Sequence, residues 1–236
     1  MKPVKLDASS TKKKPAVADV LYSTKDGKLT LDSLTNGVSN TAIAICVIPE
    51  VMENFKNGDD STGAVKTARF VSLNYMNCNT PTIGSKDYKV TGMYFGNSQV
   101  IVGNVKGGTD KTSYVGGKWN TQKCLDACTK ENKDLTNGVT NNGSAGYCAP
   151  ACCCTAYSTL GTKSGDWYLP SIGELYQIYA NKTALKSSGL SMDMGYWSSI
   201  ENSKNGVYYV NLGDGTIGNN GKYYKGYALA FLALEV

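Results

Sequence analysis

The sequence contains no histidine among its 236 residues. Histidine is the usual general base at neutral pH and the commonest zinc ligand in proteins. Its absence rules out the Ser–His and Cys–His pairs on which many nucleophilic enzymes depend. An enzyme made from this chain would have to work with carboxylates, lysines or cysteines alone, so the composition favours a protein that is not an enzyme.

Long apolar runs are missing as well. No stretch approaches the roughly 20 apolar residues that cross a bilayer, and no apolar segment of a secretory leader precedes residue 40. We therefore expect no membrane insertion. The chain is either assembled in a cytoplasm or has lost a leader.

Charge is sparse, at 18% of residues with a net charge of +5. Much of the positive charge lies near the N-terminus, and no aromatic residues alternate with those lysines to stack on bases. The segment 1–17 is therefore predicted to be a flexible basic arm and not a nucleic-acid-binding element. Its lysines are Lys2, Lys5, Lys12, Lys13 and Lys14.

Glycine and tyrosine are abundant, with 26 and 16 copies. Together with many turn-forming residues, they indicate β-structure with frequent turns. Alternating or continuous apolar runs then predict the positions of the strands. The predicted strands are 20–22, 28–31, 42–48, 68–73, 88–95, 99–105, 167–169, 196–200, 207–212 and 227–234.

Three helices are predicted from apolar periodicity and end signals. The first runs from Asn120 or Thr121 to about residue 133, and the second spans 147–158 and is interrupted by Pro150. The third spans 171–182, where Ser171 and Glu174 have the spacing of a capping box.

Eight cysteines allow three explanations: disulfides in a secreted protein, buried thiols, or metal ligands. The adjacent trio at 152–154 argues against a simple disulfide framework, so thiols packed in a helical core are favoured. Two Cys-x3-Cys pairs could in principle hold zinc, but the spacing is not that of a zinc knuckle and Pro150 lies within the second pair. We expect no metal and no cofactor. The cysteines are Cys46, Cys78, Cys124, Cys128, Cys148, Cys152, Cys153 and Cys154.

Two runs in the last third, 165–175 and 195–201, read as a strand, a proline stop with a capped helix, and a following aromatic strand. They resemble the C-type-lectin-like domain of the formylglycine-generating-enzyme-like and DUF1566-like families and of the variable proteins of diversity-generating retroelements. The resemblance covers about residues 88–234. It implies an α+β fold of short twisted antiparallel strands with two or three helices, preceded by a small β-rich module. The expected domains are the arm 1–17, a β-rich attachment module 18–80, and a recognition domain 81–236.

The calcium-binding motifs of true C-type lectins are absent. Neither Glu-Pro-Asn, Gln-Pro-Asp nor Trp-Asn-Asp occurs, and Asp214 lies in a Gly-Asp-Gly turn that needs no ion to explain it. Calcium-dependent sugar binding is therefore not expected.

The segment 201–226 has the tyrosine-, serine- and asparagine-rich composition of antibody paratopes. In the retroelement variable proteins that it resembles, the corresponding stretch is the ligand-contacting surface. Residues expected to pack inward are Trp197, Val207, Tyr209, Val210, Leu212 and Phe231. The predicted ligand-binding residues are Asn202, Asn205, Tyr208, Asn211, Asp214, Asn219, Asn220, Tyr223 and Tyr224.

The arrangement of the whole chain resembles head-fibre or decoration proteins of tailed phages that infect gut Bacteroidetes. This implies a structural virion protein, assembled in the host cytoplasm, for adhesion to a host-surface or mucosal ligand. Its N-terminal region would contact other capsid or fibre proteins, and its C-terminal face a host-surface glycan or protein. A homo-oligomer is expected, with a trimer as the form suited to a fibre, although no heptad repeat supports it.

Two alternatives remain open at this stage. The first is a bacterial surface or secreted ligand-binding protein, in which the cysteines should be paired. The second is a cysteine-dependent oxidase related to the formylglycine-generating enzymes, which predicts copper binding and a reactive thiol of low pKa. Asp166 and Glu174 are not expected to act as a glycosidase pair, because a turn and a helix cap explain them.

Overall fold

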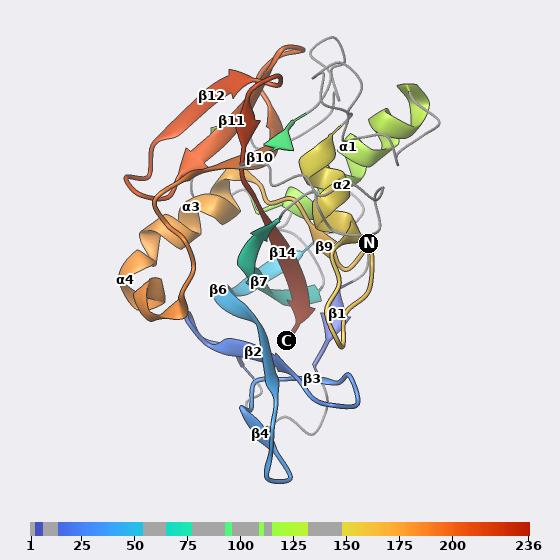
Figure 1. Cartoon of the computed structure of the whole chain (residues 1–236), viewed down its shortest axis with the longest axis vertical. Coiled ribbons are helices and arrows are strands. Elements are labelled where there is room, and N and C mark those ends of the chain that lie inside the picture. The colour runs from blue at the N-terminus through green and yellow to red at the C-terminus, as the bar shows by residue number, and fades with distance from the viewer. Residues whose placement is uncertain are drawn as a thin grey trace.

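The computed structural model describes residues 3–6, 14–53, 65–76, 93–95, 109–110, 115–131 and 148–236. Strands predominate over helices in this part of the chain (Figure 1). The helices are α1 (Gly117–Glu131), α2 (Ala149–Ala156), α3 (Ile172–Ala180) and α4 (Lys182–Leu185), with a 3₁₀ turn at Lys186–Ser188. The strands are β1 (Val4–Lys5), β2 (Val20–Ser23), β3 (Leu29–Thr30), β4 (Leu34–Thr35), β5 (Val38–Ser39), β6 (Thr41–Glu53), β7 (Val65–Met76), β8 (Met93–Tyr94), β9 (Trp167–Tyr168), β10 (Gly195–Glu201), β11 (Gly206–Asn211), β12 (Ile217–Gly221), β13 (Lys225–Gly226) and β14 (Ala228–Glu235).

A seven-stranded sheet forms the centre of the molecule. Its order is β1-β14-β7-β6-β2-β3, and β9 pairs with β14 beside β1. All neighbours are antiparallel except β1 and β14, which are parallel. The last strand of the chain is therefore hydrogen-bonded to two strands from the first third of the chain, β1 and β7, and to one from its final third, β9.

The composition of β14 explains its central position. Every residue from Ala228 to Leu234 is buried, and a strand that is apolar on both faces needs cover on both faces. Leu229 and Phe231 pack with the buried stripe of α3, whereas Leu232 packs with residues of α1 and α2. Figure 1 shows β14 between α3 on one side and α1 and α2 on the other.

The predicted α+β lectin-type fold is wrong. The structure is mostly β, and its main sheet contains two strands of 13 and 12 residues, β6 and β7, which are not the short strands of a lectin domain. Because β14 pairs with β7 along most of its length, the C-terminal strand belongs to the same sheet as the N-terminal strands. The local motifs that suggested the resemblance are present, but they do not determine how distant strands pair.

The boundary expected at residue 80 would divide the chain between an attachment module and a recognition domain. Strands on both sides of residue 80 share one sheet and one core, while the boundary itself lies outside the described residues. Val4 and Lys5, within the predicted basic arm, form β1 and pair with Leu234 and Glu235.

Most of the predicted elements are confirmed within a few residues. The helix expected from Asn120 or Thr121 begins at Gly117, and that expected at 147–158 is confined to Ala149–Ala156. Of the strands predicted at 88–95 and 99–105, only residues 93–95 are described, and Met93–Tyr94 of these form β8. Strands β1, β4, β5, β12 and β13 lie outside the predicted strands, and β12 has a single apolar residue, Ile217.

A buried ion pair joins the sheet to α3. Arg69, the only arginine of the sequence, donates from Nε to Glu174 Oε1 at 3.0 Å, and both side chains are fully buried. Arg69 also donates to Thr67 Oγ1 at 2.6 Å and to the Val115 carbonyl at 3.3 Å. Strand β7 is thereby held to the start of α3, 105 residues later in the chain.

Glu174 accepts further hydrogen bonds that begin two helices. Ser171 N donates to Oε2 at 2.7 Å, completing the predicted capping box of α3, and Gly117 N at the start of α1 donates to Oε2 at 3.1 Å. Tyr168 donates its hydroxyl to Oε1 at 2.7 Å. Burial raises the pKa of the Glu174 carboxyl, while Arg69 and the bonds from Ser171 and Tyr168 act in the opposite direction.

The described cysteines lie mainly in the apolar core, as expected. Five of the six are buried, and Cys154 Sγ contacts the Leu229 carbonyl of β14 at 3.6 Å. Cys46 lies on β6, so the thiols are not confined to helices. Cys78 and the side chain of Cys128 lie outside the described residues, so the four-cysteine zinc hypothesis is not tested. In the part of the chain that the structure covers, no helix is long and apolar enough to span a bilayer.

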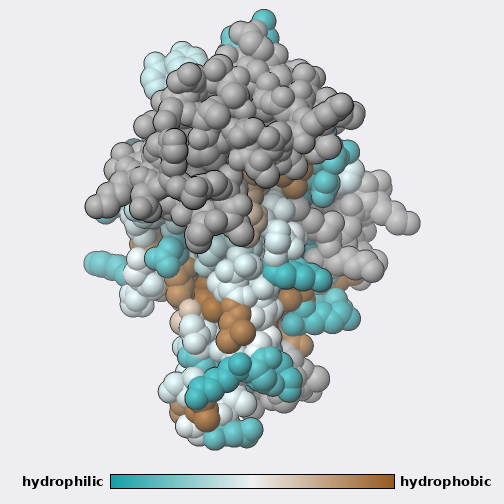
Figure 2. Space-filling view, turned by 45° about the vertical axis from the view of Figure 1, so that its right-hand side comes forward, coloured by the Kyte–Doolittle hydropathy of each residue, from teal (hydrophilic) through white to brown (hydrophobic). Residues whose placement is uncertain are grey.

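The β4–β5 hairpin projects at the lower end of the molecule. Its turn is Asn36-Gly37, both with positive φ (51° and 77°), as a two-residue hairpin turn requires. Leu34 and Val38 expose 57% and 40% of their surface, and Figure 2 shows hydrophobic atoms at this end. Asn40 fixes the base of the hairpin through bonds to Asp32 O and Thr35 Oγ1, each 2.8 Å.

Replacing Glu174 by Gln should destabilise the protein by about 3–5 kcal/mol, because Arg69 would stay buried without its counter-charge. Chemical denaturation measures this change. The matched control is Glu235→Gln, which removes the partner of Lys5 in a surface ion pair and should cost at most about 1 kcal/mol. Equal effects of the two substitutions would contradict a central role for the buried pair.

Candidate functional site

The predicted ligand-binding residues lie on a small antiparallel sheet, β10-β11-β12. Residues directly opposite each other in such a sheet share a face. Trp197, Tyr209 and Gly218 form one cross-strand row, and a bulge in β10 then places Glu201 in the next row on that face. The row of Glu201 continues through Val207 to Asn220.

The structure separates the nine predicted residues into three groups instead of one patch. Tyr208 and Asn219 face each other in mid-strand on the side of α3, and Asn220 lies on the opposite side. Asn211 and Asp214 lie at one end of the strands. At the other end, about 17 Å away for a six-residue strand, lie Asn202, Asn205, Tyr223 and Tyr224.

The group of Asn202, Asn205, Tyr223 and Tyr224 is the most exposed of the three groups. Tyr223 and Tyr224 expose 54% and 50% of their surface, and their ring centroids are 4.7 Å apart with the planes tilted by 35°. The neighbouring β10–β11 turn is exposed over all four of its residues. We call this set the tyrosine–asparagine surface: Asn202, Ser203, Lys204, Asn205, Tyr223 and Tyr224.

Backbone hydrogen bonds hold the two turns of this surface together. Lys222 N donates to the Asn205 carbonyl at 2.9 Å, linking the end of β12 to the β10–β11 turn. Within the turns, Asn202 N donates to the Gly206 carbonyl at 3.2 Å and Tyr224 N to the Gly221 carbonyl at 2.9 Å. The exposed side chains therefore project from tight turns and not from long loops.

A buried ion pair lies directly beneath the surface. Lys222 Nζ pairs with Glu201, and each side chain is only 2% exposed. The Lys222 carbonyl accepts from Phe95 N at 3.0 Å, and its ammonium lies 6.0 Å from the centroid of the Phe95 ring. Lys222 thus connects β10, the β10–β11 turn and Phe95 at the point where the chain enters the Tyr223–Tyr224 turn.

Two glycines of β12 provide room for tyrosine rings. A Cβ on Gly218 would lie 2.7 Å from Tyr209 Cε1, and one on Gly221 would lie 2.7 Å from Tyr223 Cζ. The Tyr209 ring is also fixed by Trp197, whose centroid lies 6.3 Å away at 82°. A ring lying across a glycine on the neighbouring strand is a recognised way to stabilise a weak edge strand.

The group at the opposite end has a structural explanation. Asn211 Oδ1 accepts from Gly213 N at 2.9 Å, and Asp214 Oδ1 accepts from Thr216 N at 2.8 Å. The bond from Thr216 lowers the pKa of the Asp214 carboxyl. Both side chains shape the β11–β12 turn, and no cluster of three or more metal-ligating side chains is found among the described residues.

The residues expected to pack inward do so. Trp197, Val207, Val210, Leu212 and Phe231 are all buried. Tyr209 is half-buried and packs against the core.

Sequence reasoning missed Lys204 on the surface and the Glu201–Lys222 pair beneath it. Neither charged residue of the pair stood out, because each lies among exposed polar residues in the sequence. Only the pairing of β10, β11 and β12 brings them together. Ser203 lies in the predicted segment but was not among the predicted site residues.

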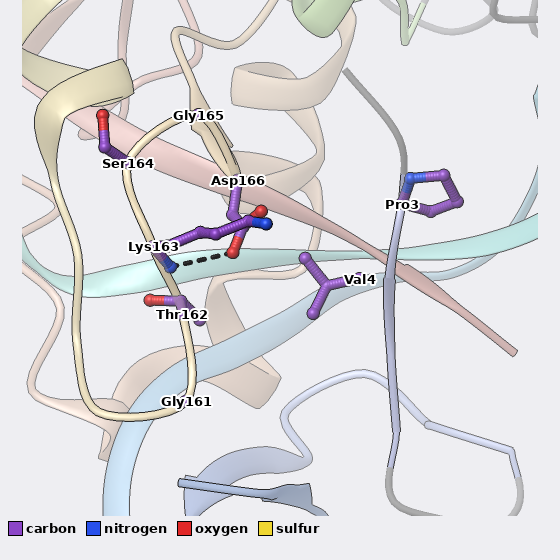
Figure 3. A pocket seen from close by; sticks show the side chains of 8 residues that line it. All are labelled: Pro3, Val4, Gly161, Thr162, Lys163, Ser164, Gly165 and Asp166. Atoms are coloured by element: carbon purple, nitrogen blue, oxygen red, sulfur yellow. Dashed lines mark hydrogen bonds between the residues drawn. The ribbon is translucent and has the colours of Figure 1, made fainter.

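A separate groove of about 800 Å³ lies between the N-terminal segment and the loop 161–166 (Figure 3). The Val4 side chain points toward this loop across the groove, whereas the Pro3 ring points away from it. Asp166 Oδ2 accepts from Lys163 N at 2.8 Å, and Thr162 Oγ1 accepts from Trp167 Nε1 at 2.9 Å. Asp166 thus has the turn role expected for it, and these polar groups serve the loop itself.

Comparison with known proteins assigns no family. No family model and no curated protein matches the chain. A crystal structure of a fimbrial protein from Bacteroides ovatus superposes with a TM-score of 0.49 at 16% identity. The match covers 92% of this chain and 48% of that one, so this chain spans about half its length. A similarity at this level assigns neither fold nor function.

Replacing Gly218 by Ala should destabilise the protein by about 1–3 kcal/mol, because the new methyl group would overlap the constrained Tyr209 ring. Gly221→Ala is the matched comparison: Tyr223 is exposed and can turn into solvent, so a change within about 0.5 kcal/mol is expected. Urea unfolding measures both. A larger loss of stability for Gly221→Ala than for Gly218→Ala would contradict this explanation, because it would indicate that the Tyr223 ring is more constrained than the Tyr209 ring.

Proposed function

We propose that this protein is a non-enzymatic adhesion protein that binds its ligand through the tyrosine–asparagine surface. The observation that carries the proposal is the pair of adjacent, half-exposed rings of Tyr223 and Tyr224 beside a turn of exposed amide and hydroxyl groups. Large aromatic area with few rotatable bonds, next to adaptable polar groups, is the chemistry of protein paratopes.

The scaffold beneath the surface supports the same proposal. Binding is weakened when side chains and loops must be ordered on contact. Here both turns are closed by backbone hydrogen bonds, and the buried Lys222–Glu201 pair lies under them. The backbone that carries the exposed groups is therefore held in place before a ligand arrives.

The ligand class that fits is a host-surface glycan or protein with hydrogen-bonding groups and an apolar face. None of the six surface residues is acidic, and Lys204 contributes a positive charge. Display on a virion and display on a bacterial surface both remain predictions. The proposal rests on the surface and holds for either setting.

The test is adhesion of bead-displayed protein to intact bacterial cells, including Bacteroidetes, and to immobilised mucin glycans. Many copies on each bead turn a weak single contact into a measurable one. The double substitution Tyr223→Ala/Tyr224→Ala should reduce binding by about tenfold or more, as expected when aromatic anchors are lost.

The control is Asp214→Ala, an exposed residue at the opposite end of the same strands, which should leave adhesion unchanged. Circular dichroism and thermal unfolding confirm that each variant is folded. Full adhesion by the double tyrosine variant would refute the assignment of the surface. Failure of the unaltered protein to bind any of these targets would refute the adhesion role itself.

A further inference from the structure

Asn220 and Gly221, at the end of β12, form one of the Asn-Gly pairs of the sequence. Gly221 N lies 3.0 Å from Asn220 Oδ1 and donates to it, so the backbone nitrogen is held against the side-chain amide of the preceding residue. Because Oδ1 is bonded to Cγ, this hydrogen bond also keeps the Gly221 nitrogen close to the carbon that it would attack. We infer that Asn220–Gly221 is a site of spontaneous imide formation and deamidation in the folded protein.

The strand pairing leaves this nitrogen available. Gly221 lies opposite Gly206, and the neighbouring ladder bond runs from Lys222 N to the Asn205 carbonyl. Gly221 is thus in a non-hydrogen-bonded pair, whose N–H points away from the partner strand. Because β12 is the edge of its sheet, that N–H is directed outside the ladder.

The chemistry needs only water. The Gly221 nitrogen loses its proton to water or hydroxide and attacks Asn220 Cγ, forming a C–N bond as the amide nitrogen leaves with a proton as ammonia. Water then adds to one of the two carbonyls of the five-membered imide and opens it. The product is aspartate or isoaspartate at position 220, and no oxidant or reductant takes part.

Asn205–Gly206 is a comparison site in the same sheet. It has the same two residues, but Gly206 N donates to the Ser203 carbonyl at 3.3 Å. Its nitrogen is therefore directed to a turn carbonyl and not to its own asparagine. The fold should separate two sites that the sequence alone makes equivalent.

The modification would affect the surface described above, a consequence that rests on the proposed function. Asn220 lies in the same cross-strand row as Glu201, about 10 Å away across two strand spacings, and alternation places Lys222 on the same side. A new carboxylate there competes for Lys222, whose pairing with Glu201 supports the Tyr223–Tyr224 turn.

Peptide mapping by mass spectrometry after incubation in mildly alkaline buffer tests the inference. The folded protein should convert Asn220 about tenfold faster than Asn205, a difference in barrier of about 1.4 kcal/mol. In concentrated urea the two rates should converge. Asn220→Gln should abolish conversion at position 220, since its imide would need a larger ring, and should leave conversion at Asn205 unchanged.

Two results would overturn the inference. One is conversion of Asn205 at a rate equal to or above that of Asn220 in the folded protein. The other is a difference that persists in urea, which would assign it to local sequence. Neither readout involves ligand binding, so these failures are distinct from failure of the adhesion proposal. Asn220→Asp, as a mimic, should lower both the melting temperature and bead adhesion.

Discussion

The contact on which the structure depends most is the buried pair of Arg69 and Glu174. It lies where β7, α1 and α3 meet, and Glu174 accepts backbone hydrogen bonds at the start of both helices. The first residue of α1, at position 117, is a glycine, and a Cβ there would approach Ser171 N to 2.5 Å. A buried ion pair is a weak source of net stability, but losing one partner is costly. The pair therefore acts mainly by excluding other arrangements of these three segments.

The buried Lys222–Glu201 pair likewise joins separate segments, here near the surface of the molecule. There the fixed elements are the backbones of two turns, and these carry exposed groups: two tyrosine rings and the amides beside them. A chain with little charge thus buries several of its charged groups in two specific pairs. One organises the core and the other the candidate surface.

Local features could be predicted from the sequence, and long-range ones could not. The Ser171–Glu174 capping box and the apolar strands of the main sheet follow from spacings of a few residues. The pairing of Leu232 with Phe70 depends on contacts 162 residues apart, and no local pattern encodes them. The composition of the segment 201–226 also correctly indicated that Tyr223 and Tyr224 are exposed. The register of β10, β11 and β12 was needed to show that Asp214 lies at the opposite end from them.

The size of the tyrosine–asparagine surface bears on the kind of ligand that the proposed adhesion role would involve. Stable protein–protein interfaces engage about 20–30 residues on each side, whereas this surface comprises six of the residues that the structure describes. A contact of this size favours a small or repeated ligand over a large protein partner, and it predicts weak binding by a single copy. Useful adhesion would then require many copies acting together, since linked weak contacts gain affinity without any new interaction. The same reasoning explains why rigidity matters here: with few contacts, any ordering of side chains on binding would consume most of the available free energy.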